Sequence, residues 1–178
     1  MRRFTVAIWL VVLAVCLAQG RLLKYWDFED ETDIQVWPED SIIELDDEFA
    51  VAGHRSIVFT PDNNFVAYFY QEMTGGHRYK LRFFAKLSAV PIERVAVAVA
   101  FAKAGGGNGS AGRESFPLVK IVAADNEWHE CVVEFTAPAE AVKAQVMLSM
   151  YRSNAEVFID ELSLCDLSVP GTQATMRP

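Results

Sequence analysis

Two tyrosines, Tyr68 and Tyr70, are spaced so that they can present two rings on one side of a β-strand. Residues two apart on a strand share a face and lie roughly 6–7 Å apart. An aromatic ring stacks on the apolar C–H face of a sugar, and neighbouring polar side chains then bind the sugar hydroxyls. We therefore predict that Trp37, Tyr68 and Tyr70 contact a carbohydrate, with Gln71 and Arg152 as polar partners. Core packing is the alternative for each aromatic residue, because aromatic side chains are often buried.

Acidic side chains are the candidates for catalysis, because glycoside hydrolysis needs two carboxyl groups about 5–9.5 Å apart. Glu130 and Glu134 share a strand face but lie about 13 Å apart, and Asp160 and Glu161 are expected on opposite faces of their strand. The histidines lack the spacing of zinc ligands, and no serine stands in a G-x-S-x-G sequence. We predict that the chain is not an enzyme. A small glycan-active enzyme with a cross-strand carboxylate pair is the less favoured alternative.

The elements that must position these residues are predicted to be β-strands almost throughout. Apolar and polar residues alternate over 77–87, and valine alternates with alanine over 94–103, as in strands with two different faces. No amphipathic helix separates the strands, as a parallel α/β fold would require. The pattern indicates a single all-β domain, an antiparallel β-sandwich or barrel. The predicted strands are 22–28, 41–45, 56–60, 64–73, 77–87, 94–103, 116–123, 128–136, 143–151 and 156–167, with a glycine-rich loop over 104–114.

Residues 1–20 have the pattern of a secretory signal peptide. Arg2 and Arg3 precede an apolar run over 6–17, and small residues follow it. The run is shorter than the roughly 20 residues of a membrane span, and no later segment is apolar enough to span, so no membrane insertion is expected after removal of the signal. We predict a domain over 21–168, a flexible tail over 169–178, and a secreted, periplasmic or cell-surface location.

The charge of the chain indicates which partners it can bind. Removal of residues 1–20 takes away two arginines and no acidic residue, which changes the formal net charge from −8 to −10. Nucleic-acid binding needs clustered lysine and arginine to neutralise phosphates, so an acidic chain is not expected to bind nucleic acid. Neutral ligands fit this charge better.

Two further features matter if the chain is exported, namely a pair of cysteines and an acceptor sequence for N-glycosylation. Cys131 and Cys165 remain after signal removal, and they form either a disulfide or two separate buried thiols, because spacing alone does not decide between them. Asn108-Gly109-Ser110 fits the acceptor sequence for N-glycosylation and lies in the predicted glycine-rich loop. That sequence has a role only where the exporting cell is eukaryotic.

Several phrases of the chain resemble a known family when their order and spacing are taken together. The chain over 23–167 resembles carbohydrate-binding modules of the family 4/9/22 type, which are galactose-binding-like jelly rolls. The phrases are Trp26-Asp27-Phe28-Glu29, Gly53-His54-Arg55-Ser56-Ile57, Tyr70-Gln71-Glu72-Met73 with the hairpin up to Lys86, the strand from Trp128 to Phe135, and Ile159-Asp160-Glu161-Leu162-Ser163-Leu164.

The resemblance implies a jelly-roll β-sandwich that binds an oligosaccharide or polysaccharide without altering it. It also implies a structural calcium ion held by Glu29 near the first strand and Asp160 in the last strand. Calcium takes 6–8 oxygen ligands, so backbone carbonyls or water would complete such a site. A jelly roll that has lost sugar binding and serves a structural role or a protein partner is the alternative function.

Overall fold

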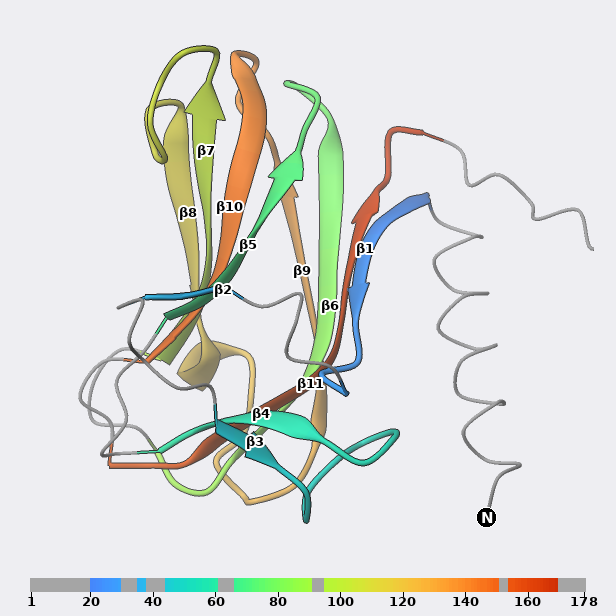
Figure 1. Ribbon diagram of the computed structural model, residues 1–178, viewed down its shortest axis with the longest axis vertical. Helices are drawn as coiled ribbons and strands as arrows, with labels where there is room; N and C mark the ends of the chain where they lie inside the picture. The colour runs from blue at the N-terminus through green and yellow to red at the C-terminus, as the bar shows by residue number, and fades with distance from the viewer. Residues whose placement is uncertain are drawn as a thin grey trace, which may run out of the picture.

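The computed structural model describes residues 20–29, 35–37, 44–60, 66–90, 95–150 and 154–169. Their strands form two antiparallel sheets, which make the two layers of a sandwich (Figure 1). The six-stranded sheet has the order β3-β4-β11-β6-β9, with β1 also paired to β11, and the five-stranded sheet has the order β2-β5-β10-β7-β8. The elements are β1 (Arg21–Trp26), β2 (Gln35–Trp37), β3 (Glu44–Asp46), β4 (Ser56–Phe59), β5 (Val66–Glu72), β6 (Arg78–Leu87), β7 (Val95–Lys103), β8 (Gly112–Pro117), the 3-10 helix η2 (Leu118–Lys120), β9 (His129–Thr136), β10 (Ala141–Met150) and β11 (Val157–Asp166).

The core lies between the two sheets because most strands keep one apolar face. Alternate residues of a strand point to opposite sides, so each sheet turns one set of apolar side chains inward. Trp26 of β1 meets Phe69 of β5 edge to face, with ring centroids 4.1 Å apart, and this contact joins the two layers. Burial of each large apolar side chain contributes roughly 1.5–3 kcal/mol. The inward residues include Tyr79, Leu81, Phe83, Ala85 and Leu87 of β6 and Val97, Val99 and Phe101 of β7.

The predicted all-β class is confirmed, while two local predictions are wrong. The segment predicted as a strand over 116–123 instead contains the end of β8 at Pro117 and the helix η2. Proline has no N–H to give to a ladder, which favours an end to the strand there. β8 begins at Gly112, inside the predicted glycine-rich loop, so the connection from β7 covers only 104–111. β2 was not predicted, because three residues carry no measurable periodicity.

β11 contains a β-bulge where its two acidic residues lie. Its pairing with β6 shifts register between Asp160 and Ser163, and Glu161 has a φ of 53°. An extra residue in one strand locally breaks the alternation of side chains and redirects them. Simple alternation does not hold at the bulge. The expectation that Asp160 and Glu161 lie on opposite faces, which rested on that alternation, therefore no longer follows.

Cys131 and Cys165 lie on the two strands that flank β6. Cys131 is opposite Phe83 and Cys165 is opposite Lys80. Strands on either side of a third strand are about 9–10 Å apart, whereas the Cα atoms of a disulfide are usually about 4.4–6.8 Å apart. The two residues are separate buried cysteines, which was one of the two predicted outcomes. Burial raises the pKa of the Cys131 thiol to about 12.

Both ends of the chain lie largely outside the described residues. The predicted signal segment up to residue 19 and the predicted tail from residue 170 belong to this part. Within the described part of the chain, no helix has the length and apolar character of a membrane span. The domain boundaries at residues 21 and 168 stay a prediction.

Candidate functional site

Tyr68 and Tyr70 lie on the outer face of the five-stranded sheet. In β5, Ala67 and Phe69 are buried in the core, while Tyr68 is half-buried and Tyr70 is 39% exposed. The two rings contact each other edge to face, with centroids 5.6 Å apart. The expectation that the two tyrosines share one face of a strand is therefore confirmed.

The strand register extends this face across the sheet. Tyr68 lies opposite Met147 and Tyr70 opposite Gln145 on β10. The neighbouring strand β7 contributes only methyl groups to this face, from alanines that are 0–8% exposed. A methyl group rises less from a sheet than glutamine or methionine, so longer side chains border a low apolar strip. We call this surface the tyrosine–alanine face, and it consists of Tyr68, Tyr70, Gln145, Met147, Ala98, Ala100, Arg113 and Ser115.

Two polar side chains hold the ring of Tyr70. The Nζ atom of Lys143 lies 4.1 Å from the Tyr70 ring centroid, which is a cation–π contact. Asn108 Nδ2 donates a hydrogen bond of 3.0 Å to the Tyr70 hydroxyl. Asn108 belongs to the loop over 104–111, so the connection between β7 and β8 reaches the edge of the tyrosine–alanine face.

The other three residues predicted to bind carbohydrate have different outcomes. Gln71 alternates with Tyr70 and lies on the side of Ala67 and Phe69, away from the tyrosine rings, and its contact with a carbohydrate stays a prediction. Its amide instead donates to the Glu72 carbonyl oxygen, at 3.2 Å. Trp37 pairs with Val66 at the edge of the sheet, but its side chain lies outside the description, as does the whole of Arg152.

Gln145 and Arg113 are the polar groups of this face that sequence reasoning missed. Gln145 lies between Tyr70 and Ala100, and Arg113 lies on the far side of Ala100. Alternation in the predicted strand 143–151 already placed Gln145 on the same side as Lys143. A signal for Gln145 was therefore present, whereas Arg113 lay in a segment predicted to be a loop.

Glu29 and Asp160 meet one loop from two sides. Oε1 of Glu29 accepts hydrogen bonds from the backbone N–H of His54 and Arg55, at 2.7 and 2.8 Å. Oδ2 of Asp160 accepts from the N–H of Val51 and Ala52, at 2.8 and 3.3 Å. The two carboxylates thus fasten residues 51–55 of the loop over 47–55, which joins β3 to β4.

Gly53 permits the close approach of Glu29 to this loop. Its φ is +70°, and a Cβ atom built on it would lie 2.4 Å from Glu29 Oε1. Any side chain here would displace the carboxylate and would also strain the left-handed backbone. The contact with Glu29 therefore explains why a glycine begins the phrase that runs from Gly53 to Ile57.

Burial changes the acidity of the carboxyl groups in this region. Asp160 is completely buried, and this burial raises its pKa to about 7, against three backbone N–H donors that favour the charged form. Burial also raises the pKa of Glu161, whose Oε2 accepts a 2.5 Å hydrogen bond from the Tyr25 hydroxyl. Burial and the neighbouring Glu161 raise the pKa of Tyr25 as well. Perturbed acids can mark functional sites, but structural networks perturb them equally.

The positions of the Glu29 and Asp160 carboxylates can be explained without a bound metal ion. The contacts of Glu29 and Asp160 with the loop are all with N–H donors, which satisfy carboxylate oxygens without a cation. Within the described ranges, no group of three or more His, Cys, Asp or Glu side chains is placed to hold a metal ion. A calcium site that relies mainly on backbone carbonyls would not form such a group, so calcium at Glu29 and Asp160 stays a prediction.

Within its described strands, the five-stranded sheet offers no close carboxylate pair. Its described strands contain two acidic residues, Glu72 on β5 and Glu114 on β8. Two further strands separate β5 from β8, and three strand spacings amount to about 14 Å. This separation exceeds the roughly 5–9.5 Å that glycoside hydrolysis requires.

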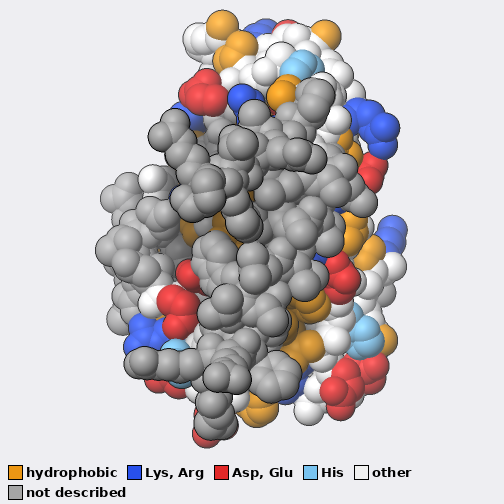
Figure 2. All heavy atoms as spheres, turned by 90° about the vertical axis from the view of Figure 1, so that its right-hand side faces the viewer, with side chains coloured by type: hydrophobic (Ala, Val, Ile, Leu, Met, Phe, Trp, Pro, Cys, Tyr) orange, Lys and Arg blue, Asp and Glu red, His pale blue; other side chains and the backbone are white. Residues whose placement is uncertain are grey.

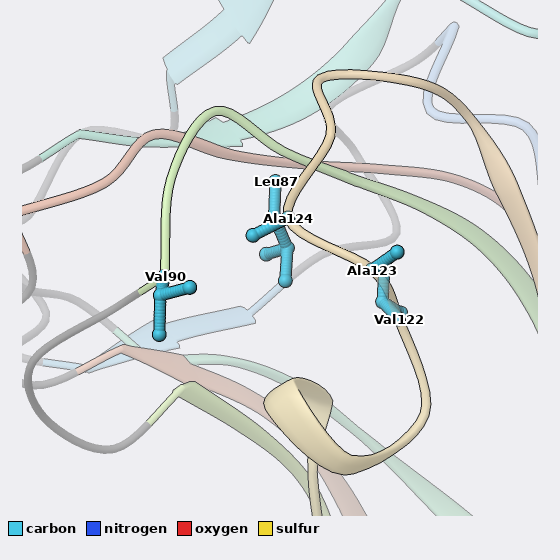
Figure 3. Close-up of a pocket in the computed structure, with 5 residues that line it drawn as sticks. All are labelled: Leu87, Val90, Val122, Ala123 and Ala124. Atoms are coloured by element: carbon cyan, nitrogen blue, oxygen red, sulfur yellow. The ribbon is translucent and has the colours of Figure 1, made fainter.

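A small pocket at one end of the sandwich has a different character. It is lined by apolar residues from the end of β6, the segment after it and the segment that follows η2 (Figure 3). Polar groups that fix the orientation of a ligand are missing from the side chains of this lining. The lining residues are Leu87, Val90, Val122, Ala123 and Ala124.

Both acidic and basic side chains show around the described rim of the side of the molecule drawn in Figure 2. Two of the ion pairs link neighbouring strands of the six-stranded sheet, Arg78 with Glu134 at 2.7 Å and Arg82 with Glu130 at 2.5 Å. This distribution suits the expectation of no nucleic-acid partner, which stays a prediction.

The fold is shared with carbohydrate-binding modules of known structure. One match is the CBM22-1–GH10 portion of endo-1,4-beta-D-xylanase 10B from Clostridium thermocellum, solved with xylohexaose (TM-score 0.58, 18% identity), which covers 84% of this chain. A second is a family 16 carbohydrate-binding module (TM-score 0.53, 15% identity), covering 84% of this chain and 98% of that one. A third is the CBM22-1 xylan-binding domain from Paenibacillus barcinonensis Xyn10C (TM-score 0.56, 14% identity), covering 83% and 96%.

These likenesses concern the fold. The present chain spans 29% of the Clostridium thermocellum chain with CBM22-1 and GH10 modules, and nearly all of the isolated modules. No protein-family model matches the chain, and no curated protein matches it by sequence. The predicted jelly-roll β-sandwich, of the type found in carbohydrate-binding modules, is confirmed.

Proposed function

We propose that this protein binds a neutral oligosaccharide or polysaccharide on the tyrosine–alanine face without altering it. The observation that carries the proposal is the pair of touching rings, Tyr68 and Tyr70, on the outer face of a sheet whose next strands supply Gln145 and an alanine strip. A sugar ring stacks on such an aromatic surface through its C–H face. The short alanine side chains of β7 are almost fully buried, so the longer side chains of Tyr70, Gln145 and Arg113 form the part of this face that a ligand would contact.

Hydrogen bonds would orient the ligand on this surface. The Gln145 amide can both donate to and accept from a hydroxyl group, and the Arg113 guanidinium can donate to ring or hydroxyl oxygens. Lys143 and Asn108 hold the Tyr70 ring in place, which reduces the entropy lost on binding. Xylan and xylohexaose are the first ligands to test, because modules with this fold were solved as xylan-binding domains or with xylohexaose.

The remaining features agree with a binding module rather than an enzyme. The described strands of the five-stranded sheet hold their two acids too far apart for hydrolysis, and the pocket of Figure 3 is lined by apolar side chains. With the signal-like segment over 1–20, we place the protein outside the cytoplasm, as a secreted, periplasmic or cell-surface binder.

Affinity electrophoresis in gels containing soluble xylan, mixed-linkage β-glucan or galactan tests the proposal. We expect at least one polysaccharide to retard the protein, and Tyr70→Ala to weaken the retention about tenfold, the effect of one lost stacking contact. Tyr68→Ala should act in the same direction. Val132→Ala is the matched control, since Val132 is 49% exposed on the six-stranded sheet and should not affect retention.

The alternative is a jelly roll that serves a protein partner or a structural role. Folded protein that no polysaccharide retards would reject carbohydrate binding and favour this alternative. Retention that survives both tyrosine substitutions would keep carbohydrate binding but move it to another surface.

A further inference from the structure

The only N-glycosylation acceptor sequence of the chain lies beside the tyrosine–alanine face. Asn108, Gly109 and Ser110 form this sequence, and each is exposed. The Ser110 N–H donates to the Gly107 carbonyl oxygen at 3.1 Å, and Gly109 has a φ of +79°. Such a turn with a left-handed third residue presents its second residue, here Asn108, at the tip.

The position of the acceptor atom is the second observation. Asn108 Nδ2, the atom to which a glycan is attached, lies 3.0 Å from the Tyr70 hydroxyl. The loop holds this position through several bonds of its own. Ser110 Oγ accepts from the Lys103 N–H at 3.1 Å, and the Ala111 N–H donates to the Phe101 carbonyl oxygen at 3.0 Å. The turn is therefore fastened to the end of β7.

We propose that Asn108 is an N-glycosylation site and that its glycan stands over Tyr70. The donor would be an oligosaccharide linked to a lipid through pyrophosphate, as in a eukaryotic secretory pathway. The bond between Asn108 Nδ2 and C1 of the first sugar forms, and the bond between C1 and the pyrophosphate oxygen breaks. The lipid pyrophosphate leaves, and the amide loses one of its two protons.

The folded structure accommodates this modification. The amide nitrogen keeps one N–H after glycosylation, and this N–H can still donate to the Tyr70 hydroxyl. The first sugar is then one bond away from an atom that lies 3.0 Å from Tyr70. The attached glycan therefore covers the exposed edge of the tyrosine pair. If carbohydrate binds there, a consequence that depends on the proposed function, the glycan competes with the ligand.

The first experiment measures glycan occupancy. The full chain is secreted from a eukaryotic host, and intact mass is measured before and after treatment with peptide-N-glycosidase. We expect a loss of mass for the native sequence and for Ser110→Thr, which keeps the acceptor sequence. Asn108→Gln and Ser110→Ala should show none. A folded, secreted native chain without glycan would overturn the proposal.

The second experiment measures where the glycan lies. Hydroxyl-radical footprinting compares oxidation of Tyr70 in the glycosylated protein and in Ser110→Ala, which keeps the Asn108 amide. We expect Tyr70 oxidation to fall several-fold in the glycosylated form, with Phe49, an exposed aromatic of the six-stranded sheet region, as internal reference. Equal oxidation of Tyr70 would overturn its coverage.

Polysaccharide retention then separates the two proposals. Weaker retention of the glycosylated form than of Ser110→Ala supports competition at the tyrosine–alanine face, and equal retention rejects it. If neither form is retained while mass and footprinting give the expected results, the proposed function fails and the glycosylation site stands.

Discussion

The tyrosine–alanine face and the loop over 51–55 use polar residues in opposite ways. On the face, Tyr70 and Arg113 stay exposed, and Gln145 is half-buried. At the loop, Asp160 is completely buried and its oxygens are engaged by backbone N–H groups. The raised pKa values of Asp160 and Glu161 thus occur where carboxyl groups are buried beside this loop. In this protein, the raised pKa values of these two acids therefore indicate a structural role.

Removal of the Asp160 carboxyl group tests this comparison with the largest expected effect. Asp160→Ala leaves the N–H groups of Val51, Ala52 and Glu161 without an acceptor in a buried place. We expect the free energy of unfolding to fall by about 3–5 kcal/mol. Urea denaturation followed by intrinsic fluorescence measures this change.

A control from the same loop isolates the effect. Asp47→Ala removes an exposed carboxylate that pairs with Arg55 and should change stability little. At temperatures where Asp160→Ala remains folded, polysaccharide retention should match that of the native chain. Lost retention in folded Asp160→Ala would contradict the separation of the two regions.

The raised pKa of Asp160 predicts a pH dependence of stability. The native state holds the proton up to pH about 7, and the unfolded chain releases it near the ordinary 3.8. The native state therefore binds more protons between these values, so the free energy of unfolding falls as pH rises from about 4 to 7. The Asp160 contribution to this slope is up to about 1.4 kcal/mol per pH unit.

Asp160→Asn provides the comparison for the pH series, because an amide does not titrate in this range. We expect the difference in stability between the native chain and Asp160→Asn to shrink as pH rises toward 7 and to become constant above it. Denaturation curves measured between pH 4.5 and 8.5 give this difference. A difference independent of pH would mean that Asp160 is ionised throughout.

The fold was predictable from the sequence because its signals are local and repeated. Alternation over 77–87 and 94–103 identified β6 and β7 to within one residue. The tyrosine pair was predictable for the same reason, since period two requires Tyr68 and Tyr70 to share a face. Alternation also placed Gln71 on the opposite side, so the choice of Gln71 as a polar partner contradicted the rule that identified the tyrosines.

The remaining features depend on contacts between distant segments. Arg113 joins the tyrosine–alanine face only because β8 pairs with β7, and Gly112 and its neighbours carry no strand signal. Two of the three N–H partners of Asp160, those of Val51 and Ala52, lie more than 100 positions away in the chain. No pattern within one segment shows that a carboxylate will meet backbone donors rather than a cation.

Two glycines with similar backbone conformation allow the cost of backbone strain to be distinguished from the cost of a lost contact. Gly53 has φ +70° and lies against Glu29, whereas Gly76 has φ +78° and an added Cβ there would meet nothing within 4 Å. We expect Gly76→Ala to cost about 1 kcal/mol from backbone strain, and Gly53→Ala about 2–3 kcal/mol because it also displaces Glu29. Thermal unfolding of both variants measures the difference. Equal losses would mean that the contact of Glu29 with the loop contributes nothing.

The predicted calcium ion gives the smallest effect and tests whether the loop region depends on metal. If calcium binds the native state at Glu29 and Asp160, a tenfold excess over its dissociation constant adds about 1.4 kcal/mol, or a few degrees in Tm. EDTA should remove this gain, and Glu29→Gln should remove the response to EDTA. Because the carboxylates already accept backbone N–H groups, an unchanged Tm would show that these donors alone hold the loop. The contrast would then be complete, with one region held internally and the other open to a ligand.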